Sequence, residues 1–465
     1  MDVSVKRWSM IRPAQDTPKE RQWISNLDVV RPTFHVPLLF FYKPNGSSDF
    51  FKPQVLQEAL SKTLVQFYPM AGRLGRDENG RLEILCNAEG VLWIEAETTS
   101  AMDDLDGFTP CSKLRKLVPT ADYSGDISSY PLIMAQPDTE VKAQEKLSYQ
   151  LRSSYIHEND PFSTVKVGAA RLISDTVIFV KVLPSTNWSE MARGLPQISM
   201  PPLIDRTLLR GRVPPIPRFH HLECDPPPSL NTSMSLGPNN HKPSTVSVFK
   251  ITKNQLNTLK AKSWEYGNKT NYNTYTILAA YIWRCATKAR GLSYDQPTKL
   301  NMPINGRPRL HPPLPSTYVG NAVFAASLIA LSGNLQSEPF LKTLERVHGT
   351  LKRMNNEYLR SALDYLETLP DITAARIKPD TYQCPNLNIN KWTRLSTYDA
   401  DFGWGRAIYV GPANIVHEGK IFILPSPTND GSLSLVACLQ IAHMKLFEKQ
   451  LYKGLKSFDK IKARY

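Results

Sequence analysis

The sequence lacks the features that mark membrane and secreted proteins. Its longest apolar stretches, such as Phe34 to Tyr42 and Thr276 to Trp283, fall far short of the roughly 20 residues that a membrane span needs. The first residues, Met1 to Trp8, contain no apolar segment of the kind that a secretory signal requires. We therefore expect a cytoplasmic protein with no membrane partner.

Closely spaced cysteines are also missing. No two of the six form a Cys-x-x-Cys pair, and they are scattered over the whole chain: Cys86, Cys111, Cys224, Cys285, Cys384 and Cys438. This spacing argues against a disulfide framework and against a zinc site. We expect reduced thiols and no bound metal.

Basic residues are in excess, but they are not clustered. The 56 Lys and Arg exceed the 42 Asp and Glu, which gives a formal charge of +14. They form no run of five or more and do not alternate with aromatic residues, so the sequence does not indicate a nucleic-acid partner. Two interpretations remain: scattered solvated lysines, or a field that attracts a small polyanion such as a nucleotide-bearing cosubstrate.

The length predicts two lobes, because 465 residues exceed what one compact core usually holds. The Pro-rich stretch from Met200 to Asn231 can be neither a helix nor a central strand, so we interpret it as a long crossover. We predict an α/β protein with an N-terminal domain over residues 1–199, a crossover over 200–243 and a C-terminal domain over 244–465.

Hydrophobic periodicity predicts individual elements in both halves. Thr33 to Lys43 is typical of a buried strand, and Pro53 opens an amphipathic helix. Arg81 to Cys86 and Val91 to Ala96 suggest a strand pair joined by a turn at Asn87–Gly90. In the second half we expect strands at Ser244–Thr252, Lys420–Leu424 and Ser432–Ala442, helices at Asn254–Glu265, Tyr275–Ala289 and Glu338–Thr368, and a closing helix that carries Met444 to Leu451.

Several short motifs stand in a fixed order. Asp401-Phe402-Gly403-Trp404-Gly405 places two glycines around a tryptophan, which suits a tight turn that fixes a large ring beside a cavity. Other motifs precede or follow it: Tyr68-Pro-Met-Ala-Gly-Arg-Leu74, Ile282-Trp-Arg-Cys285, Asn305-Gly-Arg-Pro-Arg309, Tyr318-Val-Gly-Asn321 and Ile423-Leu-Pro-Ser-Pro-Thr-Asn-Asp-Gly431.

Together these motifs resemble the plant BAHD acyl-CoA-dependent acyltransferases over nearly the whole chain. Within that family, Trp188 to Gly194, Pro201 to Leu209 and His443 to Lys449 are similar to the hydroxycinnamoyl-CoA:shikimate/quinate hydroxycinnamoyltransferase branch. The resemblance implies two chloramphenicol-acetyltransferase-like domains with a channel between them, and a structural role for the motif at Asp401. It further implies a monomer that needs no cofactor and that takes hydroxycinnamoyl-CoA as cosubstrate with a small-molecule acceptor.

The family's general base is missing. The resemblance implies a catalytic histidine in an HHxxxDG motif, which belongs within residues 133–187. That stretch does not resemble the family, and its single histidine is His157. An HHxxxD pattern occurs at His220 to Asp225, within the crossover. It is followed by Pro226 instead of glycine, so we interpret His221 as a crossover or surface histidine and not as the catalytic base.

The acceptor side differs from the family as well. Where shikimate-using relatives carry hydroxyl side chains, this chain has Val36, Leu38 and Phe40, and a carboxylate-binding arginine aligns with Ile377, beside Arg376. The lost hydrogen bonds predict an acceptor less polar than shikimate. The same three residues also suit a simple buried strand.

Three readings of the function remain open. The first is transfer of a hydroxycinnamoyl group from CoA to an alcohol or amine, impaired because no base stands at the family position. The second is a non-catalytic CoA-binding protein of the same fold. The third is that residues 133–187 reflect a misplaced exon boundary, which would also leave neighbouring strands unpaired. In that case the natural product is an ordinary acyltransferase.

Overall fold

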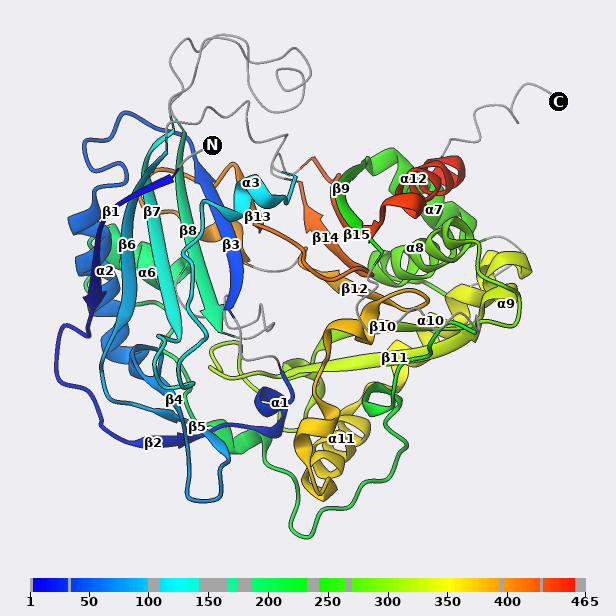
Figure 1. Cartoon of the computed structure of the whole chain (residues 1–465), viewed down its shortest axis with the longest axis horizontal. Coiled ribbons are helices and arrows are strands. Elements are labelled where there is room, and N and C mark those ends of the chain that lie inside the picture. The colour runs from blue at the N-terminus through cyan, green and yellow to red at the C-terminus, as the bar shows by residue number, and fades with distance from the viewer. Residues whose placement is uncertain are drawn as a thin grey trace.

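The structure is a computed structural model that describes residues 3–31, 35–98, 109–141, 165–173, 185–231, 242–264, 270–393, 396–426 and 430–455. Two six-stranded sheets stand side by side, one built mostly from the N-terminal half and one from the C-terminal half (Figure 1). Helices and strands are both present in each half. The predicted α/β class and two-lobed arrangement are therefore confirmed.

The first sheet contains one strand from the far end of the chain. Its order is β1 (Val3–Ile11), β6 (Val91–Thr98), β7 (Ile133–Val141), β8 (Val165–Ile173), β3 (His35–Tyr42) and β13 (Tyr409–Pro412). Because β13 pairs antiparallel with β3, from Tyr409 opposite Phe41 to Pro412 opposite Leu38, the C-terminal half completes the N-terminal sheet. The predicted domain boundaries themselves stay a prediction.

The second sheet is built only from residues after the crossover. Its order is β11 (Val323–Leu331), β10 (Pro297–Asn305), β12 (Leu387–Lys391), β14 (Lys420–Pro425), β15 (Leu433–Gln440) and β9 (Ser244–Ile251). A third, three-stranded sheet contains β2 (Arg21–Trp23), β5 (Leu82–Leu85) and β4 (Arg73–Arg76). Over its described residues, 200–231, the crossover between the halves contains two short 3₁₀ helices, Arg206–Leu209 and Leu222–Cys224, as suits its many prolines.

Helices cover the outer faces of both large sheets (Figure 1). In the first lobe α2 (Pro53–Gln66) packs against α6 (Ser185–Ala192). In the second lobe α8 (Thr274–Arg290) lies at the centre of a helical layer and contacts α7 (Lys253–Lys262), α9 (Ser332–Ser337), α10 (Phe340–Arg353) and α12 (Ile441–Leu455). Three further helices are α1 (Asn26–Val29), α3 (Ser112–Arg115) and α11 (Asn356–Thr368).

Three expectations from the sequence were wrong. Strands β5 and β6 do not form a hairpin, because β5 pairs with β2 and β4 whereas β6 pairs with β1 and β7. The helical pattern at Glu338–Thr368 is two helices, since Asn355 caps α11 by accepting a hydrogen bond from the Tyr358 N–H (3.1 Å). Residues 133–187 do not leave neighbouring strands unpaired, because β8 pairs with both β7 and β3.

At its inner strand β14 the second sheet is buried on both faces. Along β14, Ile421 and Ile423 pack into the core beneath α8, while Phe422 and Leu424 pack into the core of the first lobe. This explains why the sequence there is a continuous apolar run and not an alternation of polar and apolar residues. Strand β14 therefore lies between two hydrophobic cores and contributes side chains to both.

A buried ion pair fixes the connection between β13 and β14. Arg290, at the end of α8, contacts the Glu418 carboxylate (Nη2 to Oε1, 2.7 Å), and both side chains are almost fully buried. The second carboxylate oxygen accepts the Cys384 N–H at 2.6 Å, and Arg290 also donates to the carbonyl of Asn386 at 2.8 Å. One ion pair thus joins a helix to the segments that lead into β12 and β14.

We predict that Glu418→Gln lowers the free energy of unfolding by about 3–5 kcal/mol, because it leaves the buried Arg290 charge without its counter-ion. Guanidinium unfolding followed by circular dichroism measures this change. Glu448→Gln, an exposed position on α12, is the matched control and should leave the midpoint unchanged. Equal midpoints for the two variants would contradict the assignment of the pair as a main support of this connection.

Candidate functional site

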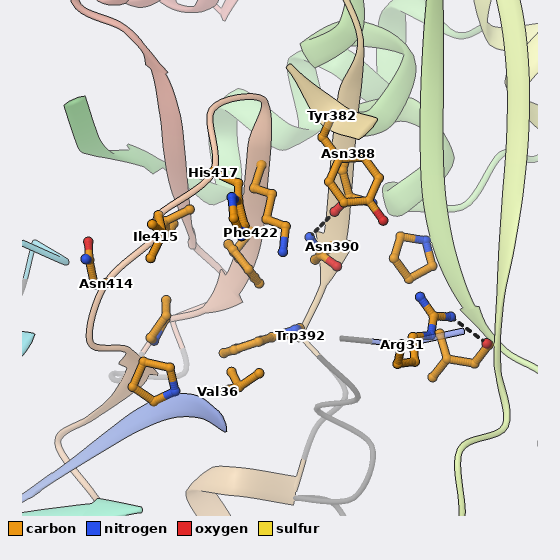
Figure 2. Close-up of a pocket in the computed structure, with 16 residues that line it drawn as sticks. Arg31, Val36, Tyr382, Asn388, Asn390, Trp392, Asn414, Ile415, His417 and Phe422 are labelled. Atoms are coloured by element: carbon orange, nitrogen blue, oxygen red, sulfur yellow. Dashed lines mark hydrogen bonds between the residues drawn. The ribbon is translucent and has the colours of Figure 1, made fainter. Parts of the chain in front are cut away.

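A cavity lies where the two large sheets face each other (Figure 2). It encloses about 790 Å³ of empty space, including the part open to solvent. Its walls come from β3, β10, β11, β12, β13 and β14 and from the loops beside them. The lining residues are Arg31, Val36, Pro37, Pro303, Val323, Tyr382, Asn388, Asn390, Trp392, Pro412, Asn414, Ile415, Val416, His417, Lys420 and Phe422. We call it the central cavity.

Aromatic and aliphatic side chains form one wall. The rings of Trp392 and Phe422 meet edge to face with centroids 4.7 Å apart, and Val36 and Ile415 lie beside them (Figure 2). Such a surface suits a flat apolar group, because an aromatic ring gains both from burial and from edge-to-face contact. This part of the cavity can therefore hold an aromatic ring of a substrate.

Next to these rings, along the same face of β12 and β14, the lining is polar and positively charged. Asn388 and Asn390 are on the same face of β12 and share a hydrogen bond, Nδ2 of Asn390 to Oδ1 of Asn388 at 2.5 Å. The Lys420 ammonium lies 5.6 Å from the centre of the Tyr382 ring. No carboxylate is among the residues that line the cavity in the described part of the chain. The local field therefore favours a negatively charged group.

A glycine lets the β13–β14 loop approach this wall. A Cβ at Gly419 (φ +85°) would lie 1.8 Å from the Tyr382 carbonyl oxygen, so no other residue fits there without displacing the backbone. The Gly419 carbonyl also accepts the Asn388 N–H at 2.8 Å. Together with the Arg290–Glu418 pair, this contact holds His417 and Lys420 at the cavity.

Only one of the predicted acceptor residues lines the cavity. Val36 does, at the end of β3, but Leu38 is buried in the core of the first lobe and Phe40 packs against the same core. Ile377 is not part of the lining; its N–H donates to the Val30 carbonyl at 3.2 Å. The alternation along β3 puts all three on one face, so the strand's own packing accounts for Leu38 and Phe40.

The pentapeptide Asp401–Gly405 forms a tight turn outside the cavity lining. One Asp401 oxygen accepts the N–H of Gly403 at 2.9 Å and of Gly405 at 2.8 Å, and both glycines have positive φ (+96° and +87°). The ring of Trp404 stacks on Phe51 at 4.5 Å and packs near Phe402 at 5.3 Å. This geometry suits the structural role that the sequence predicts, and that role stays a prediction.

His221 is not arranged as a general base. It is buried, not at the surface, and both ring nitrogens are engaged: Nδ1 with Glu223 Oε1 and Nε2 with the Ser361 hydroxyl, each at 2.9 Å. The ring packs between Tyr358 and Tyr365 on α11. The sequence candidate therefore fits a role in joining the crossover to α11. His157 lies outside the described residues.

Sequence reasoning named Val36 but missed the other residues of the central cavity, among them Arg31, Asn390, Trp392 and His417. Arg31 and His417 come from loops, where no periodicity reports the direction of a side chain. Asn390 and Trp392 carried a usable signal, since two polar residues and a tryptophan alternate at Asn388, Asn390 and Trp392 along an otherwise apolar strand.

Comparison with known proteins places the chain in a family. A profile of the Transferase family matches residues 1–141 and 173–453. The chain is 48% identical to shikimate O-hydroxycinnamoyltransferase from Nicotiana tabacum and 44% identical to a hydroxycinnamoyltransferase from Narcissus pseudonarcissus, covering 97% of this chain and 100% of each relative. The chain therefore belongs to this family, the BAHD acyl-CoA-dependent acyltransferases that its motifs resemble. The profile does not match residues 142–172, so the stretch that departs from the family is shorter than the predicted stretch, 133–187.

Solved structures share the fold. Vinorine synthase superposes with a TM-score of 0.69 at 18% identity, covering 98% of this chain and 100% of that protein. TRI101 of F. graminearum, solved with coenzyme A and T-2 mycotoxin, gives a TM-score of 0.70 at 14% identity, with 93% and 98% covered. At these identities the likeness establishes the fold alone.

No helix in the described part of the chain is long and apolar enough to cross a membrane. Within the same ranges, no group of three or more His, Cys, Asp or Glu side chains could hold a metal ion. All six cysteines are described, and each is a free thiol.

We predict that His221→Ala lowers the free energy of unfolding by about 1–3 kcal/mol, because it empties a buried site between Tyr358 and Tyr365 and removes one hydrogen-bond partner each from Ser361 and Glu223. The rate of thiol release per folded molecule should not change. Thermal unfolding and a thiol assay at a temperature where both proteins are folded measure the two effects. Loss of turnover in a folded His221→Ala protein would show that the histidine is catalytic after all.

Proposed function

We propose that this chain transfers a hydroxycinnamoyl group from its coenzyme A thioester to the hydroxyl or amine of a small acceptor. The observation that carries the proposal is the central cavity, which combines an aromatic surface at Trp392 and Phe422 with an adjoining polar, positively charged surface. An aromatic acyl group suits the first surface and a polar acceptor the second. The shikimate O-hydroxycinnamoyltransferase relative supports the same reaction.

A second cavity on the other side of β12 supports coenzyme A as the acyl carrier. Since side chains alternate along a strand, Lys391 points away from Asn390 and Trp392, and it lines a cavity with Lys260 and Trp264. Trp264 is exposed, and the two lysines offer positive charge. A surface of this kind suits an adenine base and phosphates. The two cavities thus provide for the two substrates on opposite faces of one strand.

Acyl transfer needs a base near the acceptor. The acceptor oxygen or nitrogen attacks the thioester carbonyl carbon, a C–O or C–N bond forms, the C–S bond breaks, and the acceptor's proton ends on the thiolate sulfur. Of the histidines in the described ranges, His417 is the one that lines the central cavity. His35 uses both ring nitrogens elsewhere, with Tyr123 at 2.7 Å and the Pro131 carbonyl at 2.8 Å. We assign the base role to His417.

The competing function is a non-catalytic CoA-binding protein. It is favoured by one observation, the absence of the family's HHxxxDG motif from residues 133–187. A gene-model error in that block would have the same appearance and would leave the natural product an ordinary acyltransferase. The monomeric state and the cytoplasmic location stay predictions of the sequence.

The test of the function is acceptor-dependent thiol release from p-coumaroyl-CoA, combined with calorimetric titration of CoA. Binding together with thiol release that requires an acceptor is the expected result. Binding without thiol release, over a panel of hydroxy and amino acceptors, would identify the non-catalytic protein. Absence of CoA binding would contradict both functions.

We predict that His417→Gln lowers kcat by about 10²–10⁴-fold, the usual effect of removing a general base. The dissociation constant for CoA should not change, because the second cavity is untouched. His311→Gln, at an exposed loop position, is the control and should retain the parent rate. An unchanged kcat in His417→Gln would rule out the assignment while leaving acyl transfer itself intact.

A further inference from the structure

A second open volume lies outside the central cavity, where β2 meets the start of the crossover. It holds about 780 Å³ of empty space, including the part open to solvent, and it shares no lining residue with the central cavity. Its lining comes mainly from β2 and from the 3₁₀ helix Arg206–Leu209 with the residues beside each of them. We call it the crossover groove. The proposed acyl transfer makes no use of it.

Two of the arginines that line the groove are held by carboxylates. Arg21 contacts the Glu83 carboxylate and also donates to the Arg76 carbonyl at 2.8 Å. Arg206 is buried, and its Nη1 lies 3.5 Å from Oδ2 of Asp28. These contacts fix two guanidinium groups at the walls of the groove.

Arg210 also lines the groove, but it makes no ion pair within the described part of the chain. Its guanidinium lies over the ring of Trp23, 5.0 Å from the centroid, and Arg81 contacts the same ring at 5.2 Å. Stacking engages the face of a guanidinium, while its N–H groups point outward in the plane. Arg210 can therefore donate two parallel hydrogen bonds to a carboxylate in the groove.

Two carboxylates give the same groove a negative charge as well. Glu20 accepts hydrogen bonds from the Tyr68 hydroxyl at 2.7 Å and from the Gln22 amide at 2.9 Å. These bonds hold the pKa of Glu20 below its usual value, so it is ionised at neutral pH. Glu20 is exposed and has about four lone-pair sites, so it can also accept from a ligand. Asp205 is engaged by the Thr207 N–H at 3.0 Å and hydroxyl at 2.6 Å.

Glu20 lies near the arginine side of the groove. Burial raises the pKa of the Cys86 thiol to about 12, and the charges of Glu20 and Arg206 act on it in opposite directions, so both lie within range of one sulfur atom. The uncharged part of the lining includes two half-buried rings and an aliphatic side chain, which suit an aromatic body: Trp23, Tyr68 and Ile204.

From these contacts we propose that the crossover groove binds an aromatic α-amino acid, with its carboxylate on Arg210, its ammonium on Glu20 and its ring against the aromatic part of the lining. A zwitterion matches a groove that offers both charges, whereas a simple anion or cation would lie beside a like charge. The site is separate from the central cavity and does not rest on the proposed function.

Isothermal titration calorimetry with three probes tests this site. L-phenylalanine carries both charges, N-acetyl-L-phenylalanine lacks the ammonium, and L-phenylalaninamide lacks the carboxylate. The parent protein should bind L-phenylalanine about 10–100-fold more tightly than either analogue, which is the value of one charged hydrogen-bonded contact.

Two variants locate the binding. Arg210→Gln should weaken binding of L-phenylalanine by about 10-fold or more and should not weaken binding of L-phenylalaninamide, which has no carboxylate to lose. Glu20→Gln should weaken binding of L-phenylalanine and leave the N-acetyl analogue unchanged. Arg115→Gln and Glu448→Gln, at exposed positions that line neither volume, are the matched controls and should bind all three probes as the parent does.

Both tested side chains are exposed, so both variants should fold, which thermal unfolding checks. A parent protein that gives no heat of binding with L-phenylalanine, or that binds the three probes equally, would overturn the proposal. Binding of L-phenylalanine that neither Arg210→Gln nor Glu20→Gln changes would overturn it too, because the amino acid would then lie elsewhere. The titrations contain no CoA, so a failure of the proposed function would not alter their outcome.

Discussion

The alternation of side chains along β12 and β14 is the constraint on which the rest of the structure depends. Leu387 and Ile389 of β12, like Ile421 and Ile423 of β14, are buried beneath α8, and they fix both strands against the helical layer. The residues between them must then face the other lobe. That requirement places Asn388, Asn390, Lys420 and Phe422 in one wall of the central cavity.

Charge explains why this wall can take part in chemistry. Glu418, a buried acid just before β14, is matched by Arg290 and is not among the lining residues, so its charge is neutralised within the fold. Arg31 and Lys420 are both among the described residues that line the cavity, and no carboxylate is. The fold therefore keeps the structural Arg290–Glu418 pair apart from the positive charge at the cavity, although Glu418 and Lys420 are neighbours in the sequence.

The sequence predicts the packing elements well and the cavity poorly, for a physical reason. Helix α2 leaves a periodic apolar pattern because it buries one side, whereas α8 and β3 are recognised as apolar stretches because they are buried on nearly all sides. The identity of a strand's pairing partner leaves no such pattern in the sequence. For this reason the sequence wrongly predicts that β5 and β6 pair with each other. The loop residues Arg31 and His417 have no periodic neighbours, and the segment at β13 joins the far sheet through backbone hydrogen bonds that its sequence does not specify.

The family motifs carried more information than the periodicity. They predicted the fold and the reaction class across nearly the whole chain, but they could not assign a base where the expected motif is absent. His221 illustrates the limit: a pattern of the right letters stands in a segment whose packing against Ser361 and Tyr358 uses the ring for structure. Only the arrangement in space distinguishes a buried structural histidine from one that faces a cavity.

A crystal structure with p-coumaroyl-CoA tests the central claim most directly. The account predicts the coumaroyl ring against Trp392 and Phe422, its thioester carbonyl in the central cavity, and the nucleotide on the far side of β12 near Lys260 and Lys391. A coumaroyl group bound outside the cavity between the two sheets, or a nucleotide on the same face of β12 as Asn390, would contradict it.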